Sequence, residues 1–337
     1  MRIVFVQQYG WFQLTRDASL GQHDVRVADL SAFSRETPAL IFVNPLAGAG
    51  RAGAYLLRVR EAFDTEKIHA EFVLTESAGD LESRARAAIA HGHRLLLAMG
   101  GDGTFQGLVN AASGSDVLLG LLPAGGGNDF ASAVGLPKDP ITAVRAVLRG
   151  KPRSVDLIRA RMDGGRERLY TGGGGVGLDV DAVQLAAGVY RRLPGRLRYV
   201  ASALRALRDF TPLRVRAEFP GGELPPLETK VLLAAALNTP TYGGGLRLAP
   251  DAQVDDGWLD LAFVEDLNAL QVLALLPRLL WSGNLPSSHV KRIRVRRARL
   301  SADRPCFFHG DGEILGPAPV EIEVVPRAVR VLGPTAP

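Results

Sequence analysis

The sequence predicts two domains with a cleft between them: an α/β domain on a parallel, Rossmann-like sheet, then a β-rich domain of antiparallel, sandwich-like strands. Three observations support this fold class. The chain has 337 residues, which is enough for two domains. Uniformly apolar segments alternate with helical segments up to about residue 150, as in a parallel sheet covered on both faces. Beyond that point strand-like runs dominate, many of them polar at alternate residues and separated by Pro and Gly.

The expected boundaries follow this change of pattern. Residues 38–152 form the α/β domain and residues 153–325 the β-rich domain. The last segment, 326–337, contains a strand-like run that can return to the first domain. Residues 1–37 form an N-terminal extension to which the sequence assigns no role.

In the α/β domain, apolar runs define the strands and 3.6-residue spacing defines the helices. Leu81, Ala85 and Ala88, for example, fall on one face of a helix. Strands are expected at residues 40–43, 70–74, 95–99 and 117–122, with helices at 52–63 and 79–90 and after the glycine-rich turns at 100–104 and 123–130. Because ligands of parallel sheets bind at the carboxyl ends of the strands, the glycine-rich turns there can converge on one site.

In the β-rich domain, Pro and Gly mark the ends of each expected strand. Strands are expected at residues 155–162, 168–171, 213–219, 230–237, 259–264, 291–300 and 320–325, with helices near 190–208 and 267–280. A final strand at 328–332 is the one that can join the first domain.

Composition limits the function classes. With 47% hydrophobic and 22% charged residues, the chain is typical of a soluble globular protein. Cys306, the one cysteine, excludes an intramolecular disulfide and suits a reducing cytoplasm. The scattered histidines predict no zinc site. The most apolar stretch, 267–281, is interrupted by Pro277 and Arg278 and is too short to span a bilayer. We therefore expect a cytoplasmic protein that is at most peripheral to the inner face of the membrane.

Gly100-Gly-Asp-Gly-Thr104 is the stretch that indicates phosphate binding. It lies between an apolar strand and a helix, where unmasked backbone N–H groups can point at an anion. Taken alone, it is also compatible with an ordinary strand-to-helix turn in which Asp102 caps the helix.

An alternative nucleotide motif precedes it. Gly48, Gly50 and Gly53 have the G-x-G-x-x-G spacing of a dinucleotide site, which would make the protein an NAD(P)-dependent oxidoreductase. Four residues separate the strand from Gly48, however, and Glu76 is the one nearby candidate for the required acidic residue. This alternative ranks second.

A set of ordered motifs gives the sequence its clearest resemblance. The motifs are Asn44-Pro-Leu-Ala-Gly48, Gly100-Gly-Asp-Gly-Thr104, Pro123-Ala-Gly-Gly-Gly-Asn-Asp-Phe130, Tyr242-Gly-Gly-Gly-Leu246, Asp255-Asp-Gly-Trp258 and Gly310-Asp-Gly-Glu313. In this order they resemble the diacylglycerol kinase catalytic-domain superfamily, in particular bacterial soluble lipid kinases related to sphingosine kinases. The resemblance covers residues 39 to 332.

The resemblance implies an ATP- and Mg²⁺-dependent lipid kinase that phosphorylates a hydroxyl of diacylglycerol, a sphingoid base or phosphatidylglycerol. Glu313 is implied as proton acceptor, beside Asp311 and Asp102, and a magnesium site by Asp256 with the carbonyls of Gln253 and Trp258. The implied nucleotide site comprises Asn44, Pro45, Gly48, Thr75, Gly100, Gly101, Asp102, Gly103, Thr104, Gln106, Gly107, Gly126, Asn128 and Asp129. Phosphoryl transfer needs these parts: a cradle for the phosphates, a cation and a group that orients the hydroxyl.

Some positions depart from the family pattern. Gly126 replaces a common Thr, Gln106 and Gly107 replace an Asn-Glu pair, and the glycine run after Thr171 lacks a usual Asn. These losses of polar groups leave a second alternative open, a catalytically weak, kinase-derived lipid-binding protein.

The charge of the chain indicates which kinds of partner to expect. A net charge of +5 and a pI near 9.6 suit an acidic partner. The basic stretches 190–199 and 291–299, the latter with Arg292, Arg294 and Arg296 on one strand face, are expected to contact an anionic membrane. No nucleic-acid motif is present, and a homodimer is left open.

Overall fold

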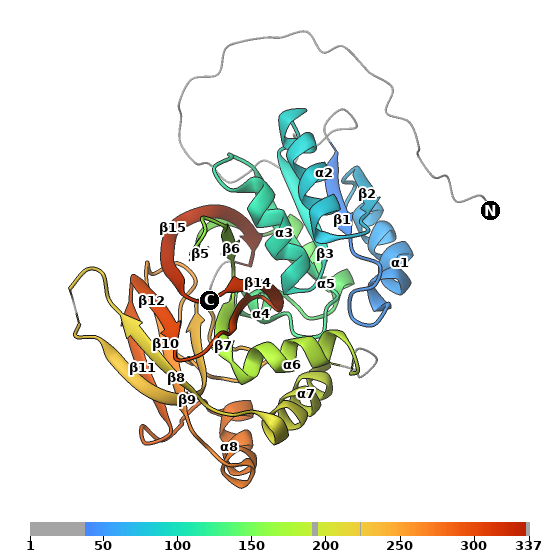
Figure 1. Cartoon of the computed structure of the whole chain (residues 1–337). Coiled ribbons are helices and arrows are strands. Elements are labelled where there is room, and N and C mark those ends of the chain that lie inside the picture. The colour runs from blue at the N-terminus through green and yellow to red at the C-terminus, as the bar shows by residue number, and fades with distance from the viewer. Residues whose placement is uncertain (1–37, 191–194, 223, 335–337) are drawn as a thin grey trace.

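The computed structural model describes residues 38–190, 195–222 and 224–334, so the expected N-terminal extension lies outside the described residues. Within these residues, all fifteen strands join one continuous sheet, in the order β14-β13-β7-β9-β8-β12-β15-β4-β3-β1-β2 along its main path. One half of this sheet is parallel and the other is antiparallel, as the sequence predicted. Figure 1 shows the two halves side by side, joined near β15.

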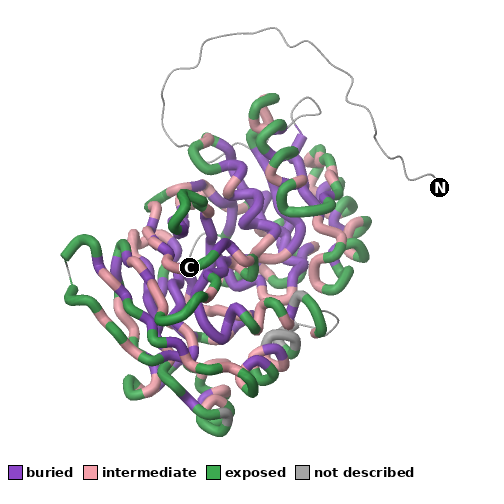
Figure 2. Tube along the Cα trace, in the orientation of Figure 1, coloured by how far each residue is buried: buried purple, intermediate pink, exposed green. Residues whose placement is uncertain are grey.

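The parallel half contains the first four strands and their helices. Its elements are β1 (Ala39–Val43), α1 (Arg51–Thr65), β2 (Ala70–Leu74), α2 (Ala78–Ala90), β3 (Leu95–Gly100), α3 (Asp102–Ala112), β4 (Leu118–Pro123), α4 (Asp129–Ala133) and α5 (Pro140–Leu148). Every residue of β1, β3 and β4 is buried, which explains why these strands are uniformly apolar. Figure 2 shows this buried centre beneath the exposed faces of the helices.

The antiparallel half contains the remaining elements. They are β5 (Lys151–Met162), β6 (Glu167–Tyr170), β7 (Gly173–Gly177), α6 (Leu178–Ala187), α7 (Gly195–Asp209), β8 (Leu213–Glu218), β9 (Leu227–Leu237), β10 (Leu259–Glu265), α8 (Ala269–Trp281), β11 (Val290–Val295), β12 (Arg297–Ala302), β13 (Phe307–Gly310), β14 (Glu313–Pro317) and β15 (Val320–Gly333). Its strand β8 alternates between buried and exposed residues, in agreement with the alternating polarity in the sequence, whereas β9 is largely buried from Val231 onward.

β15 connects the two halves. It runs antiparallel to β5 along most of its length, and near its end Arg330 and Val331 pair in parallel with β4. A register shift interrupts β15 between Val325 and Val329. At this bulge the N–H of Arg327 donates to the fully buried carboxylate of Asp156 at 2.7 Å. Asp156 therefore fixes the point at which the strand passes from one half to the other.

Two expectations about strands were wrong. The run 291–300 forms two strands, β11 and β12, because β11 pairs with β10 whereas β12 pairs with β8 and β15. The runs 320–325 and 328–332 form one strand instead, since a bulge allows the chain to continue in the sheet. In both cases the partners of the strand, which the local pattern does not contain, determine where it ends.

Candidate active site

The three glycine-rich turns of the parallel half meet at the carboxyl ends of their strands. The N–H groups of Ala124 and Gly125 donate to the carbonyl of Gly100, at 2.7 and 3.1 Å. Gly101 and Gly125 lie so close that a Cβ on Gly125 would be 2.4 Å from the Cα of Gly101. Behind the turns, the buried rings of Phe105 and Phe130 stack with centroids 5.0 Å apart. The glycines therefore allow contact between turns that the aromatic pair holds in place.

The first turn joins this arrangement through backbone and side-chain contacts. Gly48 has a positive φ of 62°, and a Cβ there would lie 2.2 Å from the carbonyl oxygen of Ala124. The guanidinium of Arg51 donates to the carbonyls of Gly48 and Gly125, at 3.0 and 3.3 Å. Asn44 donates to the hydroxyl of Thr104 at 3.3 Å. The first, third and fourth strands thus contribute to one site.

Gly125→Ala tests this contact between turns. The added methyl group would meet the backbone of Gly101, so we expect destabilisation of about 1–3 kcal/mol and weaker nucleotide binding. Thermal unfolding and titration with ATP measure the two effects. Gly79→Ala is the matched control, since the nearest atom to its new Cβ is 4.0 Å away. Equal behaviour of the two variants would contradict the interpretation.

Asp102 lies at the centre of the site, at the first turn of α3. Its two carboxylate oxygens accept the N–H groups of Phe130 and Asp129, at 3.1 and 3.2 Å. Burial, together with the nearby charges of Asp129 and Asp311, raises the pKa of the Asp102 carboxyl to about 7. Asp102 therefore changes charge near neutral pH, which is common among groups that act in catalysis.

Asp129 joins the two halves of the molecule. Its carboxylate accepts the hydroxyl of Thr241 at 2.7 Å and the N–H of Gly244 at 2.8 Å. Thr241 and Gly244 belong to the loop between β9 and β10, whereas Asp129 begins α4. This loop of the β-rich half is therefore attached directly to the glycine-rich turn at 123–128.

Asp311, at the turn between β13 and β14, is held by a nearly complete set of donors. One oxygen accepts the N–H and the hydroxyl of Thr171, at 2.7 and 2.8 Å. The other accepts the N–H groups of Gly172 and Gly173, at 2.8 and 3.3 Å. Burial raises the pKa of the Asp311 carboxyl, and these hydrogen bonds oppose that rise. The contacts fix the β13–β14 turn against the start of β7.

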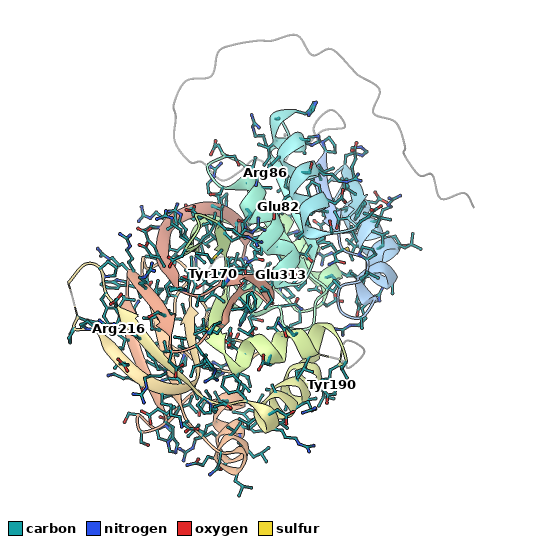
Figure 3. All side chains as sticks on the ribbon, viewed as in Figure 1. Glu82, Arg86, Tyr170, Tyr190, Arg216 and Glu313 are labelled. Carbon is teal, nitrogen blue, oxygen red and sulfur yellow. The ribbon has the colours of Figure 1, made fainter. Side chains whose placement is uncertain are left out.

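Glu313 follows at the first position of β14, and Figure 3 shows it where β14 meets the helices of the parallel half. A Cβ on Gly103 would lie 3.1 Å from its Oε1 atom, so Gly103 leaves room for this carboxylate beside Asp102. Partial burial of the carboxyl raises the pKa of Glu313, Arg168 lowers it, and Asp311 raises it further. Arg168 forms an ion pair with Glu82 of α2, which holds the two halves together at this point.

An apolar pocket extends from Asp102, Asp129 and Asp311 into the β-rich half, and Glu313 is not among its lining residues. Its walls come from α6, α7, α8 and β9, and its polar end contains Asp102, Asp129 and Asp311. The apolar lining residues are Leu178, Ala182, Val183, Val200, Ala203, Leu204, Leu232, Leu233, Leu246, Leu248, Val264, Leu267, Val272, Leu275, Leu276, Leu279, Leu285 and Val290. None of the described residues that line this apolar pocket is Lys or Arg. The pocket therefore suits a long apolar molecule with an uncharged polar end.

A second, polar pocket lies along the turn at 123–128. Arg51, Lys138 and Arg247 line it together with the glycines of that turn. Asp129, Thr241 and Gly244 line both pockets, so the polar and apolar pockets share one wall.

Comparisons with known proteins agree with this geometry. Residues 38–160 match the diacylglycerol kinase catalytic domain, and residues 174–333 match the YegS C-terminal NAD kinase beta sandwich-like domain. A diacylglycerol kinase of Mycobacterium tuberculosis is 31% identical over 297 residues, which cover 86% of this chain and 93% of the relative. The chain belongs to the diacylglycerol kinase family. It is accordingly a lipid kinase, and the oxidoreductase alternative is not favoured.

One further relative supports the lipid kinase assignment, and one solved structure shares the fold. A protein of Stenotrophomonas maltophilia described as a probable YegS-like lipid kinase is 30% identical, over 78% of this chain and 86% of the relative. The crystal structure of a diacylglycerol kinase from Bacillus anthracis has a TM-score of 0.65 at 18% identity, and the match covers 88% of this chain and 96% of that one. The latter likeness concerns the fold.

The remaining residues of the implied nucleotide site lie in several different parts of the fold. Thr75 is buried after β2, where its hydroxyl donates to the carbonyl of Val43. Gln106 donates across the halves to the carbonyl of Gly310 at 3.2 Å. Gly107 faces α2, since a Cβ there would lie 3.3 Å from Leu81. Gly126 and Asn128 lie in the turn that lines the polar pocket, whereas Pro45 and Gly100 belong to the turns already described. Gln106 and Gly107 thus connect structural elements in this lipid kinase.

At the implied magnesium site, the carboxylate of Asp256 already forms an ion pair with the guanidinium of Arg294. Asp256 accepts the N–H of Trp258 with one oxygen at 3.0 Å, and its other oxygen pairs with Arg294. The guanidinium of Arg294 also lies 5.8 Å from the centroid of the Trp258 ring. A metal held by Asp256 with the carbonyls of Gln253 and Trp258 would have to displace Arg294 from the carboxylate, and this magnesium site stays a prediction.

The basic run at 291–299 is divided between β11 and β12, and its contact with an anionic membrane stays a prediction. Arg292 donates to the carbonyls of Leu248 and Gly283, and Arg294 pairs with Asp256. Arg296 lies between β11 and β12, 4.6 Å from the Trp258 ring centroid. These arginines bind the protein itself. The other basic stretch, at 190–199, lies partly outside the described residues.

One polar cluster was not found from the sequence. The hydroxyl of Tyr242 lies 2.7 Å from Oδ2 of Asp179 and 2.6 Å from Nε2 of His309, and all three residues line the apolar pocket. The glycines of β7 make room for it, because a Cβ on Gly175 would lie 2.5 Å from the Asp179 carboxylate and one on Gly173 would lie 2.7 Å from the Tyr242 ring. The glycine run was the available signal, and its reason is close packing of these side chains.

Proposed function

We propose that this lipid kinase transfers the γ-phosphoryl group of ATP to a hydroxyl of diacylglycerol or a related lipid. The observation that carries the proposal is the wall that the two pockets share. On one side lies an apolar pocket without Lys or Arg among its described lining residues, and on the other a glycine-lined pocket with three cations. Asp129 lines both pockets, and Asp102, which accepts the N–H of Asp129, lines the apolar one, so an uncharged lipid hydroxyl and a polyphosphate can approach each other there.

Each carboxylate has a distinct part in the proposed reaction. Asp102, in its ionised form, orients the lipid hydroxyl toward the phosphorus atom. Glu313, across Gly103, accepts the hydroxyl proton, as the family resemblance implied. Asp311 is a positioning residue, because its oxygens are occupied by Thr171, Gly172 and Gly173.

Mg²⁺ enters the proposed reaction with ATP, as part of the nucleotide substrate. When bound there it neutralises charge on the transferred phosphoryl group. The proposed reaction gives Asp256 no direct role, since its carboxylate pairs with Arg294.

The lipid is proposed to come from a membrane surface. In the part of the chain that the structure describes, no helix is long and apolar enough to cross a bilayer. α7 and α8, which line the apolar pocket, also expose Leu197, Leu270, Leu273 and Trp281. Exposed apolar residues around the walls of a lipid pocket suit contact with the bilayer from which the lipid is taken.

The test is incubation of the purified protein with γ-labelled ATP, Mg²⁺ and vesicles that contain diacylglycerol, a sphingoid base or phosphatidylglycerol. A labelled lipid product is expected, with none from boiled enzyme. Lipid binding without a labelled product from any vesicle would favour the kinase-derived lipid-binding alternative. Stabilisation by NADPH but not by ATP in thermal unfolding would favour the oxidoreductase.

A further inference from the structure

One face of α3 holds both β6 and the turn between β13 and β14. Gln106 and Asn110 are four residues apart in this helix, so they lie on the same side of it. The amide of Gln106 donates to the carbonyl of Gly310 at 3.2 Å. The amide of Asn110 donates to the carbonyl of Leu169 at 2.7 Å and accepts its N–H at 3.0 Å. The helix therefore aligns β6 with the end of β13.

Two glycines on the same face leave room for two carboxylates. Gly103 and Gly107 are also four residues apart in α3. A Cβ on Gly103 would lie 3.1 Å from Oε1 of Glu313, and one on Gly107 would lie 3.9 Å from Cγ of Glu82. Figure 3 labels both acidic residues near this helix. Glu82 belongs to α2 in the parallel half and Glu313 to β14 in the β-rich half, so one helix face receives a carboxylate from each half.

Arg168 of β6 is held firmly by the first of these carboxylates. Its guanidinium donates to both oxygens of Glu82, one of the two contacts measuring 2.9 Å. The Arg168 side chain is 23% exposed and that of Glu82 is 13% exposed, so the pair is largely shielded from water. A guanidinium that donates at two points to one carboxylate is fixed in direction as well as in distance. Glu82 thus sets the orientation of the Arg168 side chain.

The strand of Arg168 runs beside the turn that carries Glu313. A Cβ on Gly310 would lie 2.9 Å from the ring of Tyr170, and the carboxylate of Asp311 accepts two donors from the residue that follows β6. Arg168 precedes Tyr170 by two residues, so both point to the same side of the strand. Glu313 in turn follows Asp311 by two residues. These contacts bring the guanidinium of Arg168 to the side of the turn on which Glu313 begins β14.

The charge of Arg168 favours the ionised form of Glu313. Burial raises the pKa of the Glu313 carboxyl, the guanidinium of Arg168 lowers it, and the carboxylate of Asp311 raises it. Asp102 adds a further carboxyl at the start of the helix on which Glu313 lies, whereas the charge of Glu82 is balanced by Arg168. A carboxylate can accept a proton only in its ionised form, which burial among other carboxylates opposes. Arg168 supplies the opposite charge that this arrangement requires.

We propose that Arg168, anchored by Glu82, is the positioning residue for Glu313, which it holds against Gly103 beside a positive charge. The inference rests on the proposed function, in which Glu313 accepts the proton of the lipid hydroxyl. As that proton moves to Glu313, the hydroxyl oxygen forms its bond to the γ-phosphorus of ATP, and the bond from this phosphorus to the bridging oxygen breaks to release ADP. Contacts from both halves of the molecule therefore place the proton acceptor.

The test is an NMR titration of the glutamate carboxyl groups in isotope-labelled full-length protein, without ATP or lipid. Glu313→Gln identifies the Glu313 signal. Arg168→Gln is expected to raise the pKa of Glu313, because it removes the positive charge beside it. Glu82→Gln breaks the same ion pair but retains that charge, so it should not raise the pKa of Glu313. A merely structural effect of losing the ion pair would change the Glu313 signal alike in both variants.

Turnover of the lipid provides the second readout. Arg168→Gln is expected to lower kcat by about 10- to 100-fold with the KM for ATP within about twofold, since the proton acceptor is displaced while the nucleotide site is intact. Arg168→Lys should recover part of kcat, because it keeps the charge but not the two-point contact. Arg161→Gln is the matched control, since it breaks the exposed ion pair of Arg161 with Glu167 between β5 and β6. It should retain the native kcat.

Three results would overturn the inference: an unchanged pKa of Glu313 in Arg168→Gln, an equal rise of that pKa in Glu82→Gln, or a native kcat in Arg168→Gln. The titration requires neither nucleotide nor turnover. Absence of a phosphorylated lipid from the native protein would therefore refute the proposed function, while the titration would still decide whether Arg168 acts on Glu313.

Discussion

Asp102→Asn is expected to reduce lipid phosphorylation by about 10²- to 10⁴-fold while the protein stays folded. The amide keeps the size of the side chain but loses the negative charge that orients the hydroxyl in the proposed reaction. The measurement is the rate of labelled lipid formation at saturating ATP. Asp116→Asn is the matched control, because Asp116 lies at the surface and pairs with Arg330 far from the carboxylate cluster. Full activity of Asp102→Asn would remove Asp102 from the mechanism.

The carboxyl of Asp102 also determines the expected pH dependence of kcat/KM. Burial and the charges of Asp129 and Asp311 raise the pKa of Asp102 to about 7, so the carboxyl is protonated below that pH. If the ionised form is required, kcat/KM should fall about tenfold per pH unit on the acid side. Residual activity of Asp102→Asn should lack this limb. A limb that stays unchanged in the variant would assign it to another group.

The raised pKa of Asp102 makes the folded protein more stable at low pH than at high pH. The folded protein retains the Asp102 proton over the range from pH 3.8, the ordinary value, to about 7, where an unfolded chain has lost it. The Asp102 proton therefore contributes to the free energy of unfolding fully below pH 3.8, and this contribution is lost as the pH rises through about 7.

Asp311→Asn is expected to lower both stability and activity. The carboxylate accepts two donors on each oxygen, from Thr171 on one side and from Gly172 and Gly173 on the other. An amide would turn its NH₂ group toward one of these pairs and leave buried donors without an acceptor, at a cost of about 1–3 kcal/mol. Displacement of the β13–β14 turn would also move Glu313, so we expect at least about a hundredfold loss of activity.

Asp311→Asn changes the charge of the side chain without changing the backbone conformation. Asp311 has a positive φ of 50°, which Asn tolerates well, so the change does not strain the turn. Thermal unfolding and the lipid phosphorylation assay give the two readouts. Asp303→Asn is the control, because Asp303 accepts a single backbone N–H, that of Arg214, at the surface. An unfolding temperature that matches the control would show that the four contacts of Asp311 contribute little.

The sequence predicted the parallel half closely because its signals are local. Strands buried on both faces must be apolar throughout, and the turns that follow them must be glycine-rich where backbones touch, as at Gly101 and Gly125. The motifs then connected Gly100–Thr104 with Gly310–Glu313 through a family resemblance. Neither composition nor spacing alone would have brought these two segments together.

The antiparallel half was harder to predict because its strand limits depend on partners that are distant in the sequence. Whether 291–300 is one strand or two depends on its neighbours β10, β8 and β15, which are distant in the sequence. β7 resembles a loop in the sequence, because its five residues are Gly-Gly-Gly-Val-Gly. These glycines are explained once Tyr242, Asp179 and His309 are seen to fill the space where side chains would be.

The sequence by itself determined the fold class, the glycine-rich turns and the acidic residues of the site, since these follow from local periodicity and recognisable motifs. The tertiary structure alone decided how those parts face each other. It placed Asp311 on Thr171, 140 residues away, paired Asp256 with Arg294, and set Arg247 at the polar pocket. Ion pairs and pocket walls form between segments that only the folded chain brings together, so their partners have no signature in the local sequence.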